Sequence, residues 1–122
     1  AYPERIEAGV ESLDLFKIGT LNFQAPDLRR FPCLRLAYQA LQRGEAAPAI
    51  LNAANEVAVA NFLAERMPYK HIPLLIEAVL EKISVNSITC LEDVLEADCA
   101  ARVAAEEWLA ASRPEFAAGA IR

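Results

Sequence analysis

The sequence predicts an all-α fold: a small four-helix-type bundle preceded by an extended linker with one short strand. Alanine and leucine dominate the 122 residues, whereas glycine occurs only four times and aromatic residues make up 7% of the chain. This composition favours helices, because strands prefer β-branched and aromatic residues. Apolar residues also recur at helical spacing from Phe31 onward. We therefore predict a linker over residues 1–27, a C-terminal helical bundle over residues 28–112 and a flexible tail over residues 113–122.

Length, composition and charge exclude several classes of protein. The chain is long enough for one domain core but not for two. Its hydrophobic share of 55% is too high for a disordered segment, and no apolar run reaches the roughly 18 residues that a membrane-spanning helix needs. The net charge of −5 argues against non-specific binding to nucleic acid, which relies on clustered Lys and Arg. We expect neither a membrane nor a nucleic acid as a partner.

Two features bear on cellular location. The chain has no start methionine and no basic-then-apolar leader, so no secretory or lipid signal can be recognised, and its first residues look like the middle of a longer protein. The three cysteines, Cys33, Cys90 and Cys99, lack metal-binding spacing, and their odd number leaves one unpaired. We interpret them as reduced, partly buried thiols of a cytoplasmic protein.

The linker contains the one segment that alternates like a strand, residues 20–24, in which Leu21 and Phe23 point to the same side. An isolated strand leaves its backbone groups unpaired, so it needs a partner strand. No second comparable strand occurs in the sequence, which indicates that the segment pairs with another molecule or that its sheet is missing. We expect the apolar linker residues either to lack order or to pair with a second copy; they include Leu13, Phe16, Leu21 and Phe23.

Three helices are predicted in the first part of the bundle. The first covers residues 32–43, with Pro32 in its first turn, Gly44 as its stop, and an inward face formed by Leu34, Ala37, Tyr38 and Leu41. The second begins between Pro48 and Asn52 and ends at Arg66, and its wide apolar stripe consists of Ile50, Leu51, Ala54, Val57, Ala58, Asn61 and Phe62. The third opens near His71, tolerates Pro73 in its first turn, and carries Leu75, Ile76, Val79, Leu80 and Ile83.

The C-terminal part is predicted to form two helical segments. Thr89 and Glu92 have the spacing of a capping box, in which each side chain satisfies a free backbone N–H. The short helix that follows is expected to break at Asp98, which would be the N-cap of the last helix. We expect the last helix to carry an exposed Arg102–Glu106 pair and to point four side chains inward: Val103, Ala104, Trp108 and Leu109.

Groups that could carry chemistry are few. His71 is the only histidine and has no companion at metal-ligand spacing, so we interpret it as a surface or partly packed residue. The acidic pairs Glu92-Asp93 and Glu106-Glu107 are typical of solvated helix faces, because neighbours on a helix point about 100° apart. Arg29-Arg30 could hold a phosphate, although contact with an acidic neighbour or with water fits them better. The glycines form no phosphate-binding loop.

The most distinctive string is LNAANE at residues 51–56. Asparagine favours helix caps, so Asn52 is interpreted as an N-cap with Asn55 and Glu56 in the first turn. The alternative is an amide pair that binds a ligand. From the residues alone, the chain offers a scaffold and no site.

Several strings, in order, resemble the C-terminal part of 1-deoxy-D-xylulose 5-phosphate reductoisomerases. The resemblance rests on YPERI at residues 2–6, LDL at 13–15, LNFQAPD at 21–27, FPCL at 31–34, LNAANE at 51–56, FL at 62–63 and LEK at 80–82. It extends to about Ala111. It implies an enzyme of the methylerythritol phosphate route that converts 1-deoxy-D-xylulose 5-phosphate to 2-C-methyl-D-erythritol 4-phosphate with NADPH and a divalent metal, Mg or Mn.

The resemblance also implies which parts of such an enzyme are present. The family is dimeric and has an N-terminal NADPH-binding domain, a central catalytic domain and a C-terminal helical bundle that a long linker reaches. This sequence matches only the linker and the bundle, so no catalytic, cofactor-binding or metal-binding residue is carried over to it. The implied partners are the other two domains of the same polypeptide and a second subunit, and we expect the chain alone to be inactive.

Two alternative interpretations place the chain in other functional classes. The chain could be a free-standing helical protein-interaction module that docks partners through the Leu21/Phe23 edge. It could also be a helix-turn-helix DNA-binding protein, but residues 72–84 carry only Lys82 against Glu77 and Glu81, which does not suit a recognition helix. The reductoisomerase fragment is the interpretation that we carry forward.

Overall fold

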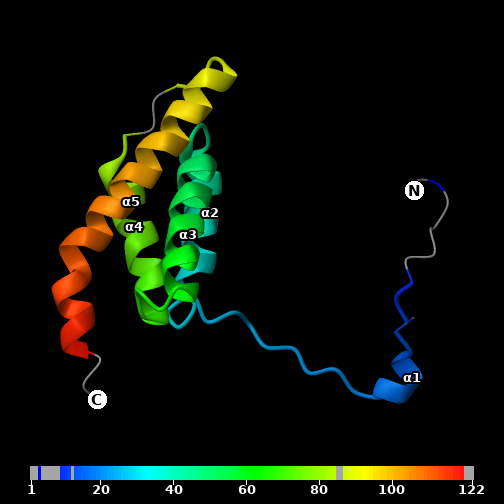
Figure 1. Ribbon diagram of the computed structural model, residues 1–122. Coiled ribbons are helices and arrows are strands. Elements are labelled where there is room, and N and C mark those ends of the chain that lie inside the picture. Colours follow the sequence, from blue (N-terminus) through cyan, green and yellow to red (C-terminus); the bar gives the residue numbers. More distant parts are fainter. Residues whose placement is uncertain (1–2, 4–8, 12, 85–86, 120–122) are drawn as a thin grey trace.

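The computed structural model describes residue 3 and residues 9–11, 13–84 and 87–119 (Figure 1). The described residues form helices and no strand, which confirms the predicted all-α class. The helices are α1 (Leu15–Ile18), α2 (Pro32–Arg43), α3 (Ala47–Leu63), the 3-10 turn η1 (Tyr69–His71), α4 (Ile72–Lys82) and α5 (Leu91–Gly119).

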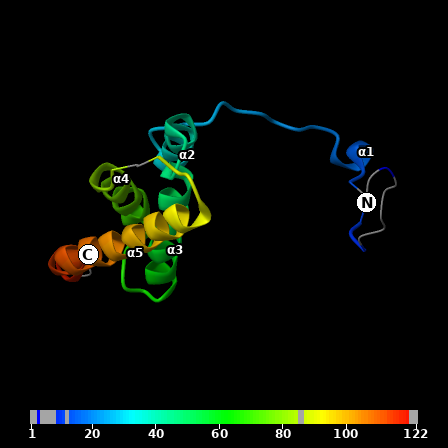
Figure 2. The ribbon, with the colours of Figure 1, turned by 90° about the horizontal axis from the view of Figure 1, so that it is seen from above.

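The bundle is built around α3 and α4. Helix α3 packs against α2, α4 and α5, and α4 also contacts α2 and α5. Seen from above, α2 lies on one side of this central pair and α5 crosses on the other (Figure 2). The core consists mainly of aliphatic side chains, together with Met67, and its largest fully buried members are Ile50, Leu75, Ile76 and Val79.

Helix α2 has the predicted ends but a different inner face. Pro32 stands in its first turn, and Gly44 adopts a φ of 68° and donates its backbone N–H to the carbonyl of Ala40. The buried residues are Leu36 and Ala40, whereas the four residues predicted to face inward are exposed: Leu34, Ala37, Tyr38 and Leu41. The prediction was wrong because α2 carries two apolar rows, and its contacts with α3 and α4 select the row with the smaller residues.

Helix α3 confirms the predicted apolar stripe and corrects its ends. Ile50, Ala54, Val57, Ala58 and Asn61 are buried, and Leu51 and Phe62 are half-buried beside them. The helix begins at Ala47, so Asn52 lies within it and is not its N-cap. It ends at Leu63 rather than Arg66 because the chain turns at Glu65, where φ is +57°.

The third predicted helix is observed as η1 followed by α4. Pro73 lies in the first turn of α4, where a missing backbone N–H leaves no hydrogen bond unmade. Leu75, Ile76, Val79 and Leu80 are buried as expected. Ile83 is the C-cap and is half-buried against the core.

Helix α5 is one continuous helix, so the predicted break at Asp98 is wrong. Asp98 bonds to Arg102 one turn later and does not act as a cap. The predicted capping box is also wrong, because Asp93 rather than Glu92 accepts the backbone N–H groups of Thr89 and Cys90, at 2.8 and 3.1 Å. These N–H donors hold the pKa of Asp93 at about 2.

The inward face of α5 is partly as predicted. Ala104 and Leu109 are buried and Trp108 is half-buried, but Val103 is 55% exposed. The helix continues to Gly119, well into the segment predicted as a tail. Residues 120–122 lie outside the described residues, and the flexibility predicted for 113–122 stays a prediction.

The described part of the linker is extended and exposed. Asp14 caps the short helix α1 by accepting the backbone N–H groups of Phe16 and Lys17. Residues 20–24 are extended but form no strand, so the predicted strand is wrong: in the described residues no neighbouring edge supplies the missing hydrogen bonds. The segment runs away from the bundle (Figure 1). Among the described residues, no helix is long and apolar enough to cross a membrane.

Candidate functional site

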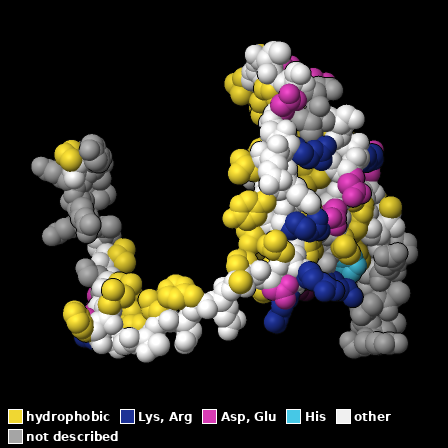
Figure 3. All heavy atoms as spheres, turned by 180° about the vertical axis from the view of Figure 1, so that it is seen from behind, with side chains coloured by type: hydrophobic (Ala, Val, Ile, Leu, Met, Phe, Trp, Pro, Cys, Tyr) yellow, Lys and Arg dark blue, Asp and Glu magenta, His cyan; other side chains and the backbone are white. Residues whose placement is uncertain are grey.

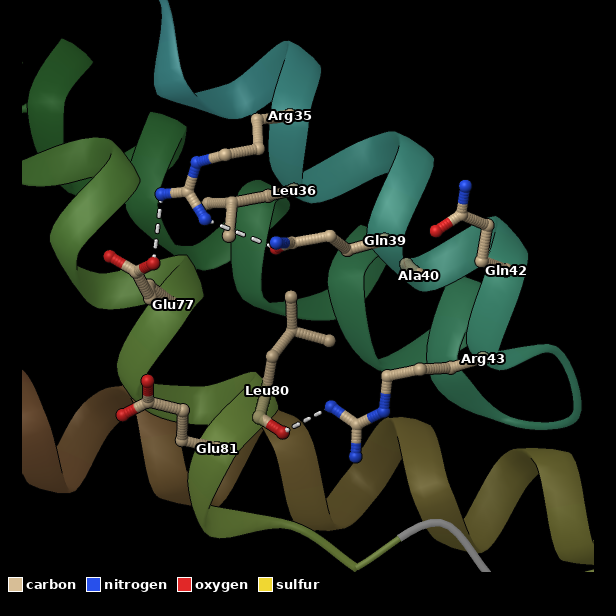
Figure 4. A pocket seen from close by; sticks show the side chains of 9 residues that line it. All are labelled: Arg35, Leu36, Gln39, Ala40, Gln42, Arg43, Glu77, Leu80 and Glu81. Atoms are coloured by element: carbon tan, nitrogen blue, oxygen red, sulfur yellow. Dashed lines mark hydrogen bonds and ion pairs between the residues drawn. The ribbon is translucent and has the colours of Figure 1, made fainter. Parts of the chain in front are cut away.

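A hollow lies between α2 and α4. It has a volume of about 560 Å³ and is partly open to solvent, and Figure 4 shows the side chains that line it. Its lining combines charged, amide and apolar side chains: Arg35, Leu36, Gln39, Ala40, Gln42, Arg43, Glu77, Leu80 and Glu81. The close-up shows that two arginines of α2 reach across to α4, one at each end of the hollow.

Both arginines are engaged in contacts within the bundle. Arg35 donates from Nη2 to Oε1 of Glu77 at 2.8 Å and from Nη1 to Oε1 of Gln39 at 3.1 Å. Arg43 donates from Nη1 to the backbone carbonyl of Leu80 at 2.9 Å. That carbonyl lies in the last turn of α4, where a cation is favoured. These bonds connect α2 to α4. The lining contains no Ser, Cys, His or Lys, and of its two carboxylates Glu77 is bonded to Arg35.

A second polar cluster joins α3 to α5. Asn52 donates its side-chain amide to Glu56 at 3.1 Å, and Arg102 donates to Glu56 at 2.7 Å and to Asp98 at 2.7 Å. The Arg102 guanidinium, aided by the Asn52 amide, holds the pKa of Glu56 below its usual value. The two carboxylates in turn raise the pKa of Arg102. The predicted Arg102–Glu106 pair is therefore wrong, since Arg102 is engaged by Asp98 and Glu56.

The asparagines of the distinctive string do not come together as a ligand-binding pair. The Asn52 amide is engaged by Glu56, while Asn55 is half-buried on the same helix. The buried amide of this helix is that of Asn61, which donates to the backbone carbonyl of Val57 at 2.9 Å. The Asn52 amide thus supports the Glu56–Arg102 bond between α3 and α5, whereas the Asn61 amide bonds within α3.

His71 is packed among aromatic rings, as a partly buried structural residue would be. Its ring lies 4.9 Å from the ring of Phe116 and 6.4 Å from that of Trp108, between centroids. Its Nδ1 atom is buried and has no hydrogen-bond partner. Among the described side chains, His71 belongs to no group of three His, Cys, Asp or Glu residues that could hold a metal ion.

The remaining candidates are isolated from one another. The three cysteines are unpaired and exposed, which corrects the expected partial burial of Cys90 and Cys99. Neighbouring atoms partly desolvate the Cys33 thiol and raise its pKa. The backbone N–H groups of Arg29 and Arg30 bind the Asp27 carboxylate, at 2.9 and 3.0 Å. The Arg30 guanidinium lies 5.7 Å from the centre of the Phe31 ring. This turn starts α2, and no anion site is needed to explain it.

The donor sets in the described residues do not fit a metal or a nicotinamide cofactor. No three of the described His, Cys, Asp and Glu residues are grouped to hold a metal ion. The carboxylates that do cluster, Glu56 and Asp98, are bonded to Arg102. A dinucleotide would need a glycine-rich turn at a helix N-terminus. Instead, the first turns of α2, α3 and α4 contain Pro32, Pro48 and Pro73, and α5 starts at the Thr89–Asp93 cap.

Sequence reasoning missed two features of the surface. The first is the cross-helix bonding of Arg35 and Arg43, which no sequence spacing reveals because the partners lie 42 and 37 residues away. The second is a smaller hollow of about 280 Å³ at the start of α2, lined by Arg30, Phe31, Pro32, Cys33, Tyr69, Lys70, Ile72 and Pro73. The proline and aromatic residues at both of its edges were the available signal.

Comparison with known proteins gives one consistent family. Residues 1–104 match the DXP reductoisomerase C-terminal domain family. The 1-deoxy-D-xylulose 5-phosphate reductoisomerase of Nitrosomonas eutropha is 62% identical over 108 residues, which are 88% of this chain and 26% of that protein. The enzyme of Nitrosospira multiformis is 60% identical, over 88% of this chain and 27% of that protein.

Solved structures agree with the sequence matches. The reductoisomerase from Zymomonas mobilis in complex with NADPH superposes with a TM-score of 0.80 at 40% identity, over 89% of this chain and 29% of that chain. A DOX-P reductoisomerase in complex with magnesium gives 0.79 at 37% identity, over 92% and 30% of the two chains. The chain thus spans about a quarter of the length of the curated relatives it matches.

Proposed function

The chain belongs to the DXP reductoisomerase C-terminal domain family, and from this membership we propose that it is the non-catalytic C-terminal region of such an enzyme. The observation that carries the proposal is the match over residues 1–104, together with relatives of which the chain covers only about a quarter. The role we assign to the region is support: its bundle braces the catalytic part of the same polypeptide.

The complete protein is proposed to convert 1-deoxy-D-xylulose 5-phosphate to 2-C-methyl-D-erythritol 4-phosphate in isoprenoid biosynthesis. NADPH would supply the hydride, and a divalent metal, Mg or Mn, would polarise the substrate oxygens. The names of the relatives and the NADPH and magnesium complexes among the solved structures support this assignment. The complete enzyme is further proposed to be a cytoplasmic homodimer.

Chemistry is proposed to take place outside this region, with no catalytic, cofactor-binding or metal-binding residue within it. The state of its polar groups supports this. The Arg35 and Arg43 guanidiniums bond across to α4, and the Glu56–Arg102–Asp98 cluster bonds α3 to α5. Side chains that are hydrogen-bonded between helices hold those helices in position, which fits a structural, supporting role.

Nicotinamide absorbance tests the assignment directly. The 122-residue chain is mixed with NADPH, Mg²⁺ and 1-deoxy-D-xylulose 5-phosphate, and the complete protein that carries the same C-terminal sequence is the matched control. We expect the absorbance to fall only with the complete protein. Turnover by the chain alone would overturn the non-catalytic assignment, and inactivity of the complete protein would overturn the assigned reaction.

The supporting role has its own test in the complete protein. Leu75 is fully buried in α4, so Leu75→Ala should loosen the bundle without touching the reacting groups. We expect thermal inactivation at a lower temperature with an unchanged NADPH dissociation constant below that temperature. The neighbouring exposed position provides the control, Leu74→Ala. Equal inactivation temperatures for the two variants would argue against bracing.

One observation favours a second candidate, a free-standing helical interaction module. Linker side chains that no described residue covers include Phe23, 87% exposed, and Leu21, 54% exposed. Such residues could dock an external partner. The reading frame decides between the two candidates: coding sequence for a long upstream region excludes the module, and a start codon at the linker excludes the reductoisomerase.

A further inference from the structure

Helix α2 carries a row of apolar side chains that the bundle does not use. Leu34, Ala37, Tyr38 and Leu41 are spaced by three and four residues, which places them in one stripe along the helix; we call it the outer face of α2. All four are exposed, Tyr38 by 58% and Leu41 by 70%. The core contacts of the same helix come from Leu36 and Ala40 on another side.

The exposure of this face is not explained by the fold of the bundle. A surface helix of a small bundle normally buries one apolar stripe and turns polar residues to water. Helix α2 buries one stripe and presents a second one, and contiguous apolar surface of this kind marks an interaction site. The view from behind, onto the side where α2 lies, shows hydrophobic side chains gathered along one edge of the bundle (Figure 3).

The apolar surface continues beyond the helix. Phe31, just before α2, is 55% exposed, and towards the linker Leu28 and the linker residue Phe23 are 42% and 87% exposed. Phe31 also lines the hollow of about 280 Å³ at the start of α2. The charged side chains that line this hollow are Arg30 and Lys70, both basic. An occupant matched to this surface is therefore apolar, with carboxylates at the end that meets these two cations.

We propose that this region docks onto the preceding part of the reductoisomerase polypeptide through the outer face of α2. The matching surface on that preceding part is an apolar patch bordered by carboxylates. The proposal rests on the proposed function. Solved relatives hold this fold, with a TM-score of 0.80, inside chains of which it makes up only 29%, so a large tethered partner accompanies it there. A tethered partner has a high effective concentration, and the linker that would tether it continues into this face.

Thiol accessibility in the complete protein tests the proposal. Leu41→Cys and Tyr38→Cys report on the outer face, while Leu63→Cys is the matched control, because Leu63 is 73% exposed at the end of α3 against 70% for Leu41. Val103→Cys, on α5 and 55% exposed, is a second control. Alkylation is followed peptide by peptide, so the native thiols do not interfere. We expect positions 38 and 41 to react at least tenfold more slowly than positions 63 and 103.

Cross-linking identifies the occupant. A bifunctional reagent attached to the cysteine at position 41 is used in a mixture of unlabelled and ¹⁵N-labelled complete protein. Docking within the polypeptide gives links to upstream peptides of the same label. Links between differently labelled chains would assign the face to a second copy, and equal alkylation rates at positions 41 and 63 would show it to be free; either result overturns the proposal.

Charge substitution supplies a readout that does not depend on the cysteines. In the complete protein, Leu41→Glu should split thermal unfolding into two transitions or move the first one down, whereas Leu63→Glu should leave the curve in place. Activity separates the two proposals. An active protein with a freely reacting position 41 overturns the docking face alone, while an inactive protein with a protected position 41 overturns the assigned reaction alone.

Discussion

The interior row of α4 and the outer face of α2 are built from the same kinds of side chain and have opposite environments. Leu75 in α4 is 0% exposed, whereas Leu41 in α2 is 70% exposed. Both belong to apolar rows with helical spacing. The difference lies in what stands opposite: α4 has α2, α3 and α5 around it, while the described residues place nothing over the outer face of α2. Apolar spacing therefore identifies a surface that is suited to burial but does not identify its partner.

The sharpest contrast within one helix is between adjacent residues of α4. Leu75→Ala should lower the free energy of unfolding by about 2–5 kcal/mol, because a fully enclosed side chain leaves a cavity when it is shortened. Leu74→Ala, at a site 49% exposed, should cost about 1 kcal/mol or less. Urea unfolding of the 122-residue chain measures both. Similar losses of unfolding free energy in the two variants would mean that the inner row of α4 is not tightly packed.

Close packing of α5 gives the next largest expected effect. Ala105 is fully buried in the core, where α5 meets α3 and α4. Ala105→Leu should destabilise the chain by about 1–3 kcal/mol, since the added atoms find no space. Ala110 on the same helix is exposed, so Ala110→Leu should be close to neutral. If Ala105→Leu stabilised the chain in calorimetry, α5 would have a gap along this side.

The start of α5 depends on charge rather than on burial. The pKa of Asp93 falls from 3.8 to about 2 on folding, so the ionised carboxylate stabilises the folded chain. This stabilisation is present in full above the unfolded pKa and disappears as the pH falls from about 4 through about 2. We expect the melting temperature to drop over this range by a few degrees less in Asp93→Asn than in the unmodified chain.

The control for this acid dependence is Glu96→Gln. Glu96 lies exposed on the same helix, three residues after Asp93. Its substitution removes a carboxylate from the same helix but leaves the bonds of Asp93 to Thr89 and Cys90, so the effect of the cap should remain. An unchanged dependence in Asp93→Asn would instead show that the cap at Thr89 and Cys90 does not contribute.

The smallest effect is expected on the outer face of α2. Leu41→Ala should change the stability of the 122-residue chain by no more than about 0.5 kcal/mol, because the side chain is already in water. Leu36→Ala, on the buried side of the same helix, should cost about 2–5 kcal/mol. A large loss at Leu41 would indicate that the isolated chain covers this face, for example by self-association, which sedimentation would detect.

Much of the fold could be predicted from local sequence. The ends of α2 follow from Pro32 and Gly44, because proline suits a first turn and glycine accepts the positive φ of a helix end. The buried row of α3 follows from apolar spacing. The predictions that were wrong concern places where the local sequence allows two arrangements. These are the cap of α5 by Asp93 or Glu92, a break or continuation of the helix at Asp98, and the two possible inner faces of α2.

The candidate polar sites were less predictable than the helices. The Arg102 side chain has Glu106, Asp98 and Glu56 as possible partners, and the first two are equally near along the helix. Only the packing of α3 on α5 brings Glu56 within 2.7 Å and settles the choice. The same holds for Arg43, whose acceptor is a backbone carbonyl at Leu80. Because every residue has a backbone carbonyl, the residue type at position 80 does not indicate that its carbonyl accepts this hydrogen bond.

The sequence by itself determined the helical class, the approximate positions of the bundle helices and the resemblance to the reductoisomerase C-terminal region, because these depend on composition, short-range spacing and local strings. The tertiary structure decided which row of α2 is buried and which is left exposed. The physical reason is that a helix records which of its faces are apolar, whereas burial depends on the helices that pack against it. Helix α2 has two apolar rows, and the other helices of this chain cover only one of them.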